Sequence, residues 1–157
     1  MHLNGKKILL GVTGSIAAYK AAFIIRLLKK QGAFVRVIMT KASSDFVTPL
    51  TLGTLSTEPV LIDFLKDEGT GEWNNHVDLG LWADIMLVAP ATANSISKMA
   101  TGNADNFLIA TYLSAKCPVF IAPAMDLDMY AHGSTKENLD TLIKRGNHII
   151  YPGSGEL

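Results

Sequence analysis

The alternation of short, continuous apolar runs with helical patterns constrains this fold more than any other feature of the sequence. An apolar run at residues 8–12 is followed by a helical pattern at 16–30 and a second apolar run at 34–39. Apolar runs of this length, bounded by turn residues, are typical of strands buried on both faces. A strand, a crossover helix and a second strand are the basic unit of a parallel sheet. The sequence therefore predicts an α/β protein.

The same alternation continues along the chain. Further strands are expected at residues 60–62, 85–89, 119–122 and 148–151, the second ending at Pro90. Further helices are expected as two short ones within residues 40–57 and as longer ones at 95–100 and 106–115. Residues 68–75 are polar and predict a loop. Five or six strands alternating with helices predict a single domain with one open, doubly wound parallel sheet.

Local signals mark some of the helix ends. Asp105 is the expected N-cap of the helix at 106–115. Residues 134–137 have the Ser-x-x-Glu spacing of a capping box, which predicts a further helix that stops at Gly146.

Composition narrows the functions open to the chain. The chain has 14 basic residues (Lys and Arg) and 14 acidic residues (Asp and Glu), so its formal net charge is zero. This balance argues against a nucleic-acid or anionic-membrane binder, which would show an excess of basic residues. A single cysteine, Cys117, excludes an intramolecular disulfide framework and a zinc ribbon, and it fits a reducing cytoplasm. Apolar runs fall short of the roughly 18 residues of a membrane span, and we expect no signal peptide.

The charged fraction is low and has two explanations. Charged residues make up 18% of the chain, against about 25% in typical domains. A sheet covered on both faces would produce this value, and so would a buried subunit interface. Composition leaves both explanations open.

The turn after the first strand has the features of a phosphate site. Gly14 permits close backbone approach, the following helix offers free N–H groups, and Ser15 adds a hydroxyl. The spacing is neither the dinucleotide fingerprint nor a P-loop, and the second strand ends at Thr40 without the acid that binds an adenosine ribose. These features favour a mononucleotide phosphate over NAD. A tight turn without a ligand would have the same local sequence.

Two later turns also carry small and polar residues. Thr92, Asn94 and Ser95 follow the strand at 85–89 and offer hydrogen bonds to a heterocycle or a phosphate, and residues 123–126 follow a later strand. Each turn alone is equally explained as a loop that caps a helix. Ligands of doubly wound sheets bind beyond the carboxyl ends of the strands, so we expect these turns to share one pocket.

Other reactive residues give weak signals by themselves. A lone histidine such as His76 is more often structural or exposed than catalytic. The remaining histidines show no metal-ligand spacing, and Asp126 with Asp128 forms only a weak carboxylate pair, so we expect no metal site. Cys117 precedes a proline at a strand start, where a buried, inert thiol is expected.

The motifs taken together resemble one family. In chain order they are residues 14–20 (Gly-Ser-Ile-Ala-Ala-Tyr-Lys), His76, residues 90–95 (Pro-Ala-Thr-Ala-Asn-Ser), residues 104–106 (Ala-Asp-Asn) and residues 123–125 (Pro-Ala-Met). This ordered set is similar to that of the homo-oligomeric flavin-containing cysteine decarboxylases, above all their phosphopantothenoylcysteine decarboxylase branch. The resemblance covers residues 7–151 and implies a Rossmann-like flavoprotein fold.

The resemblance also implies a cofactor, FMN, and the residues around it. Gly14, Ser15 and Thr40 would serve the phosphate, and Thr92, Ala93, Asn94 and Ser95 the flavin and ribityl chain. The other implied cofactor positions are Ile16, Asp105 and Ala124, with Asp105 near a neighbouring subunit's cofactor. Met125 and Asp126 would contact the substrate.

The implied reaction converts 4′-phosphopantothenoylcysteine to 4′-phosphopantetheine in cytoplasmic coenzyme A biosynthesis. In the family, FMN oxidises the thiol side to a thioaldehyde, which is an electron sink for loss of CO₂, and His76 would be the base. Family members form trimers, or dodecamers of trimers, with FMN at a subunit boundary. Two alternatives stay open: a peptidyl-cysteine decarboxylase of lantibiotic type, and a non-catalytic FMN-binding partner subunit.

The sequence departs from the family pattern at two places. Asp126 stands where the family has asparagine, and an ionised aspartate can only accept hydrogen bonds and would repel a substrate carboxylate. Residues 152–157 stand where a substrate-covering flap with a proton-donating cysteine would begin, and Cys117 does not occupy that position. We therefore interpret residues 1–157 as an FMN-binding decarboxylase domain cut before the flap and a ligase domain, with weak final reduction.

Overall fold

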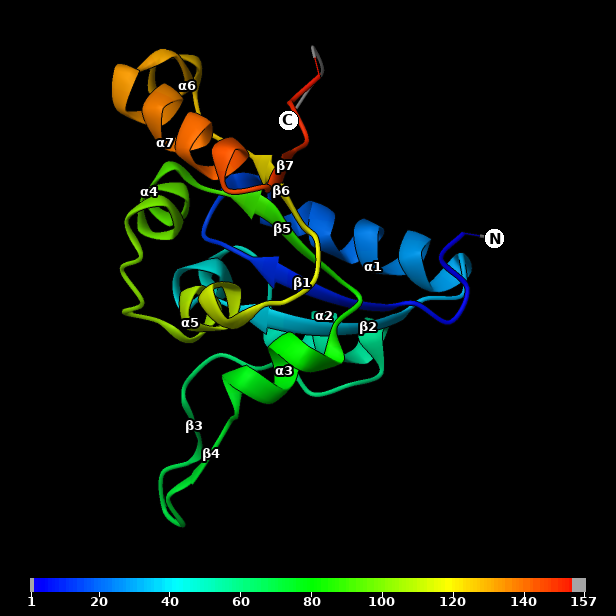
Figure 1. The fold of residues 1–157 in the computed structure, drawn as a ribbon. Helices are drawn as coiled ribbons and strands as arrows, with labels where there is room; N and C mark the ends of the chain where they lie inside the picture. Colours follow the sequence, from blue (N-terminus) through cyan, green and yellow to red (C-terminus); the bar gives the residue numbers. More distant parts are fainter. Residues whose placement is uncertain (1, 154–157) are drawn as a thin grey trace.

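The central sheet has the predicted open, doubly wound α/β architecture. The computed structural model describes residues 2–153, and five parallel strands form the main sheet in the order β2-β1-β5-β6-β7 (Figure 1). They are β1 Lys7–Val12, β2 Phe34–Met39, β5 Ile85–Ala91, β6 Val119–Pro123 and β7 His148–Ile149. The chain leaves β1 for β2 on one side and returns to β5 on the other. The carboxyl ends of β1 and β5 are therefore the switch point where such sheets bind ligands.

Helices cover both faces of this sheet. Alternate residues of β1 show the division: Leu10 packs in one core with Ile25, and Leu9 packs in the other with Ile96. The first core lies under α1 Lys20–Lys30 and α2 Pro49–Ser56. The second lies under α3 His76–Trp82, α4 Ala93–Thr101, α5 Phe107–Ser114 and α7 Gly133–Lys144. Helices on both faces of the sheet thus explain at least part of the low fraction of charged residues.

The remaining elements are short. They are two 3₁₀ turns, η1 Ile16–Tyr19 and η2 Ala42–Asp45, the helix α6 Leu127–Ala131, and the antiparallel strands β3 Leu65–Asp67 and β4 Glu72–Trp73. The β3–β4 hairpin extends away from the body of the molecule (Figure 1). Within residues 2–153, no helix is both long and apolar enough to cross a membrane.

Several predicted elements differ in extent. The predicted loop at 68–75 is interrupted only by the two residues of β4, and residues 60–62 contribute only a bridge between Leu61 and Ile38. The predicted strand at 148–151 is reduced to two residues. Strand β5 continues past Pro90 to Ala91, because the β5–β6 register shifts there and tolerates a residue without an N–H.

Two predicted caps are wrong. Asn106, not Asp105, caps α5: its side-chain oxygen accepts from the Ile109 N–H at 2.9 Å, while Asp105 pairs with Lys98. The capping box at residues 134–137 does not form, because α7 already begins at Gly133. His132 takes the cap position there, and its Nδ1 accepts from the Ser134 N–H at 3.0 Å.

Residues 154–157, which belong to the predicted flap boundary, lie outside the described residues.

Candidate functional site

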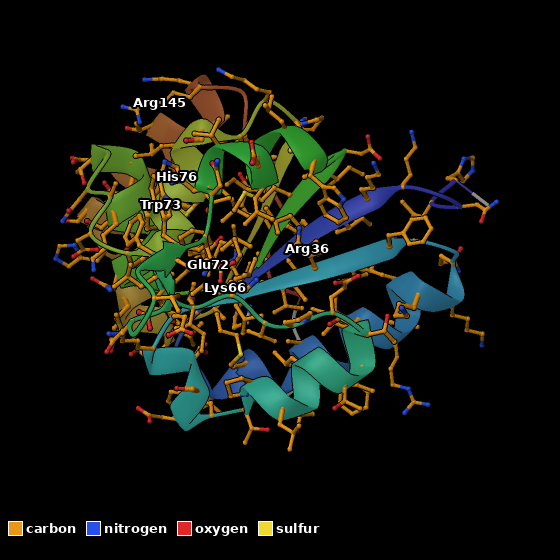
Figure 2. All side chains as sticks on the ribbon, turned by 90° about the horizontal axis from the view of Figure 1, so that it is seen from below. Arg36, Lys66, Glu72, Trp73, His76 and Arg145 are labelled. Carbon is orange, nitrogen blue, oxygen red and sulfur yellow. The ribbon has the colours of Figure 1, made fainter. Side chains whose placement is uncertain are left out.

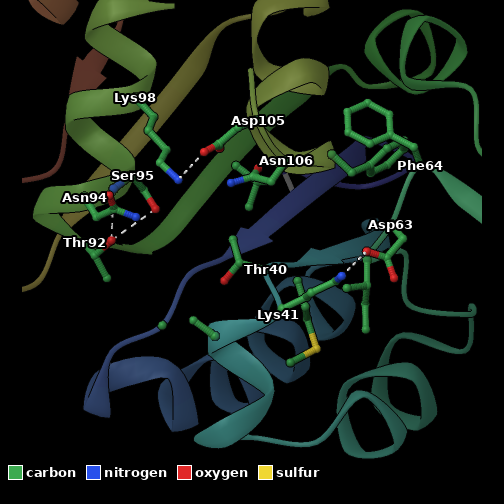
Figure 3. A pocket seen from close by; sticks show the side chains of 16 residues that line it. Thr40, Lys41, Asp63, Phe64, Thr92, Asn94, Ser95, Lys98, Asp105 and Asn106 are labelled. Carbon is green, nitrogen blue, oxygen red and sulfur yellow. Dashed lines mark hydrogen bonds and ion pairs between the residues drawn. The ribbon is translucent and has the colours of Figure 1, made fainter. Parts of the chain in front are cut away.

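A cavity of about 540 Å³ opens at the carboxyl ends of β1, β2 and β5 (Figure 3). Six of the predicted cofactor positions line it: Gly14, Thr40, Thr92, Asn94, Ser95 and Asp105. They come from segments far apart in sequence, and the sheet topology brings them together at the switch point. The cavity thus joins the turns after β1, β2 and β5, whereas the turn at residues 123–126, which was expected to share the pocket, does not line it.

Thr13 connects the first of these turns to the third. Its side chain is 1% exposed, and its hydroxyl donates to the Pro90 carbonyl at 2.6 Å. The same oxygen accepts from the Thr92 N–H at 3.0 Å. One buried hydroxyl thus fixes the relative position of the loops after β1 and β5. Sequence reasoning identified the turn but not this role, which depends on a partner 77 residues away.

Gly14 lies where a side chain would not fit. A Cβ built on this residue would stand 2.7 Å from the Cβ of Ala42 in η2. The loop after β1 therefore packs directly against the loop after β2, and this contact forms one wall of the cavity.

The predicted hydroxyls cap the helices that border the cavity. Thr92 is the N-cap of α4: its Oγ1 accepts from the Ser95 N–H at 3.1 Å and donates to the Ser95 hydroxyl. Thr40 Oγ1 accepts from the Ser43 N–H at 3.2 Å, and Ser15 Oγ accepts from the Ala17 N–H at 3.1 Å. The nine-residue α4 therefore begins at the cavity, and the N–H groups of its first turn other than that of Ser95 suit an anion.

Two ion pairs lie on either side of Thr40 at the rim (Figure 3). Lys98 Nζ is 2.9 Å from Asp105 Oδ2, and Lys41 Nζ is 3.4 Å from Asp63 Oδ1. Both lysines line the cavity, and sequence reasoning missed both. The adjacency of Lys41 to Thr40 was an available signal, whereas the pairing of Lys98 with Asp105 depends on the path of the loop between α4 and α5.

The remaining walls are largely apolar and include two aromatic rings. Met39, Ile62 and Leu108 line the cavity, together with Phe64 and Phe107. The cavity thus combines an apolar wall with hydroxyl, amide and ammonium groups, which suits a ligand with a flat apolar part and an anionic end.

His76 lies beside the cavity rather than in its lining. It is the first residue of α3, and the side chain of Asn75 caps the helix by accepting from the Val77 and Asp78 N–H groups. The imidazole meets the rings of Phe64 and Phe107 edge to face, with centroids 6.1 and 6.4 Å away. Through these two rings His76 adjoins the cavity.

The predicted cofactor position Ala124 and the predicted substrate residues Met125 and Asp126 do not line the cavity. The Ala124 N–H donates to the Ala91 carbonyl at 3.0 Å, so Ala124 adjoins the end of β5. Met125 packs against the core, and Asp126 caps α6 by accepting from the Met129 N–H at 2.9 Å. Helices α6 and α3 lie far apart in Figure 1, with α6 near the top and α3 below β1 and β2. One chain therefore does not bring His76 and Asp126 together.

Three predicted cofactor positions are also absent from the cavity lining. The side chain of Ile16 is 65% exposed on η1, and neither Ser15 nor Ala93 lines the cavity.

Cys117 is half-buried, and burial raises the pKa of its thiol, as expected for an inert cysteine. Residues 2–153 contain no cluster of three or more His, Cys, Asp or Glu side chains suited to a metal ion.

Comparison with known proteins places the chain among flavoproteins. The family model described as Flavoprotein matches residues 1–157. The chain is 47% identical over 154 residues to the coenzyme A biosynthesis bifunctional protein CoaBC of Vibrio vulnificus, covering 98% of this chain and 38% of that protein. It is 65% identical over 111 residues to a cysteine/cysteine sulfinic acid decarboxylase of an unidentified prokaryote, covering 71% of this chain and 31% of that protein. The chain thus spans about a third of the length of these relatives.

Two solved structures share the fold over nearly the whole chain. The FMN-dependent cysteine decarboxylase SpaF superimposes with a TM-score of 0.89 at 32% identity, covering 98% of this chain and 87% of that one. A PPC decarboxylase variant complexed with pantothenoylaminoethenethiol superimposes with a TM-score of 0.82 at 31% identity, covering 98% and 86%.

Proposed function

The chain belongs to the flavoprotein family, and on that premise we propose that it binds FMN and decarboxylates 4′-phosphopantothenoylcysteine to 4′-phosphopantetheine. The observation that carries the proposal is the gathering of Gly14, Thr40, Thr92, Asn94 and Ser95 around one cavity at the switch point. The similarity to CoaBC over 98% of the chain supports a role in coenzyme A biosynthesis. Residues 1–157 would then be the FMN-binding decarboxylase domain of a longer protein with a substrate flap and a ligase domain.

The cavity fits FMN in size and in chemistry. Its volume of about 540 Å³ falls within the range of roughly 300–1,000 Å³ that small-molecule and cofactor sites occupy. The apolar wall with Phe64 and Phe107 suits an isoalloxazine ring, and the hydroxyls of Thr40 and Thr92 suit a phosphate or a ribityl chain. Lys98 supplies a nearby cation.

Each predicted residue has a proposed part in holding the cofactor. Gly14, Ser15, Ile16 and Thr40 would hold the phosphate end, with Ser15 acting through its hydroxyl and Ile16 through its backbone N–H. The flavin and ribityl chain would be held by Thr92, Ala93, Asn94 and Ser95, with Asp105 and Ala124 at the edges. Asp105 also fixes Lys98 at the rim through their ion pair.

Bound FMN would supply the two-electron oxidation that makes the sulfur-bearing carbon an electron sink for loss of CO₂. The chain itself would contribute His76 as the base, since its imidazole adjoins the cavity through Phe64 and Phe107.

We propose that the working form is a cytoplasmic homo-oligomer, a trimer or a dodecamer of trimers. Met125 and Asp126 are the proposed substrate contacts, yet α6 and α3 lie far apart in one chain (Figure 1). A site that holds both His76 and Asp126 would therefore combine two copies. Exposed apolar side chains along η1 and α1, among them Ile16, Phe23 and Leu27, offer a surface for such contacts.

The 65% identity to a cysteine/cysteine sulfinic acid decarboxylase favours one alternative, a smaller amino-acid substrate. A C-terminal cysteine peptide is a second, because peptidyl-cysteine decarboxylases share the family. A non-catalytic FMN-binding partner subunit is the third, and Asp126 in place of asparagine favours it.

One purified sample distinguishes these functions. Its visible spectrum with added FMN reports cofactor binding, and CO₂ release is then measured from 4′-phosphopantothenoylcysteine, a C-terminal cysteine peptide, free cysteine and cysteine sulfinate. We expect a flavin spectrum and the fastest release from 4′-phosphopantothenoylcysteine. Faster release from another substrate would replace the proposed one. Binding of FMN without any CO₂ release, also in a longer version with the flap, would favour the non-catalytic alternative.

A further inference from the structure

Three aromatic rings meet at one end of the cavity. Phe64 and Phe107 lie edge to face with a centroid distance of 5.6 Å and an interplanar angle of 85°. His76 is perpendicular to both, at 84° to Phe64 and 88° to Phe107. Perpendicular aromatic pairs are favourable beyond the apolar area that they bury. The imidazole is therefore held from two directions.

The two phenyl rings are anchored in different ways. Phe107 is 1% exposed and belongs to the core under α5, so its ring is fixed by packing. Phe64 is 36% exposed at the base of the β3–β4 hairpin. Asn74 holds that base closed: its N–H donates to the Phe64 carbonyl at 2.7 Å, and its Nδ2 donates to the Asp63 carbonyl at 2.8 Å.

The same packing distinguishes the two nitrogens of His76. Nδ1 is buried and has no hydrogen-bond partner among residues 2–153. A nitrogen enclosed in this way cannot reach a bound ligand. Nε2 is therefore the nitrogen through which His76 can exchange a proton.

We infer that Phe64 and Phe107 are positioning residues, which hold the imidazole of His76 so that Nε2 is the nitrogen presented to the substrate. The inference rests on the proposed function for the role of His76, but the arrangement of the rings stands without it. The hairpin then has a purpose of its own: Phe64 directly precedes β3, and the Asn74 hydrogen bonds hold the segment that carries it. Lys66 and Glu72 form an exposed ion pair across the two strands of this hairpin (Figure 2).

The test compares Phe64→Leu, Phe64→Tyr and Phe107→Leu in the FMN-loaded protein. Phe64→Leu removes one ring while keeping an apolar side chain, and Phe64→Tyr keeps the ring. At Phe107 the replacement is leucine rather than a smaller residue, because a large cavity in the core would threaten folding. Trp73→Leu is the matched control, since Trp73 is an exposed aromatic residue of the same hairpin (Figure 2).

The first readout is NMR of ¹³C,¹⁵N-labelled histidine, with the His76 signal assigned by its loss in His76→Asn. We expect Phe64→Leu and Phe107→Leu to shift the His76 ring signals far more than Trp73→Leu does, and Phe64→Tyr to leave them close to the wild type. Equal shifts in Phe64→Leu and Trp73→Leu would overturn the inference. This readout needs no activity, so it remains decisive if the proposed function fails.

The second readout is steady-state CO₂ release from 4′-phosphopantothenoylcysteine. A displaced catalytic group can cost up to about a hundredfold in rate, so we expect kcat to fall about tenfold or more in the two leucine variants. KM is expected to change less than kcat in these variants, and Phe64→Tyr, which keeps the ring, is expected to lose less kcat than Phe64→Leu. Wild-type kcat in Phe64→Leu with a shifted His76 signal would also overturn the inference.

Discussion

The backbone N–H of Thr92 donates to the hydroxyl of Thr13 at 3.0 Å, and that hydroxyl in turn donates to the Pro90 carbonyl. This pair of hydrogen bonds joins the loop that follows β1 to the loop that follows β5. Both loops border the cavity, so their relative position determines its shape.

Thr13→Val is expected to weaken both stability and FMN binding. Valine has nearly the same shape but leaves the Thr92 N–H without its partner, while the Pro90 carbonyl keeps only the Thr13 backbone N–H at 3.3 Å. The expected cost is about 1–3 kcal/mol in unfolding free energy. Urea denaturation and FMN titration measure the two effects. Thr141→Val, which loses a hydroxyl contact on α7 far from the cavity, is the control. Equal losses in both variants would contradict a special role for Thr13.

Gly14→Ala is expected to displace the loop after β1. The new Cβ would meet the Ala42 Cβ at 2.7 Å, and overpacking of this kind costs about 1–3 kcal/mol. Adding Ala42→Gly removes that contact and should restore part of the stability and of the FMN affinity, as followed by thermal unfolding and titration. Gly133→Ala, where a Cβ meets nothing within 4 Å, should not destabilise the protein. No rescue by Ala42→Gly would refute the contact as the cause.

Asp126 has a structural role that can be separated from substrate binding. Asp126→Ala removes the N-cap of α6 and should cost about 1 kcal/mol, whereas Asp126→Asn keeps an equally good cap. If Asp126 also faces a substrate carboxylate, Asp126→Asn should lower KM for 4′-phosphopantothenoylcysteine without a change in melting temperature. An unchanged KM in Asp126→Asn would confine this residue to its capping role.

Cys117 should react slowly in the folded protein. Burial raises the pKa of its thiol, so the thiolate, which is the reactive form, is scarce at pH 8. We expect iodoacetamide to label the native protein more slowly than the urea-unfolded protein, and the native rate to rise at higher pH than for a free thiol. Equal native and unfolded rates across the pH range would contradict this assignment.

The parallel sheet could be predicted because strands buried on both faces are continuous apolar runs. The runs at 8–12 and 34–39 match β1 and β2 to within one residue. The hairpin could not be predicted in this way, since its residues are exposed, lack alternating apolar periodicity and include Gly69 and Gly71. Its base is held instead by the contacts of Asn74 with the Asp63 and Phe64 carbonyls.

Some features of the candidate site could likewise be predicted from the sequence, and others could not. Gly14, Thr40 and Thr92 could be placed together because each follows a strand of one parallel sheet. The tie through Thr13, the ion pair of Lys98 with Asp105 and the rings around His76 depend on contacts between distant segments. The spacing of residues in the sequence does not reveal such contacts, so only the folded structure shows them.

CO₂ release by the FMN-loaded protein and by its His76→Asn variant tests the central claim most directly. With 4′-phosphopantothenoylcysteine as substrate, the wild-type chain is expected to release CO₂. The variant should bind FMN with an unchanged visible spectrum and release almost none. Wild-type rates of CO₂ release from the FMN-loaded His76→Asn variant would contradict the account of this site.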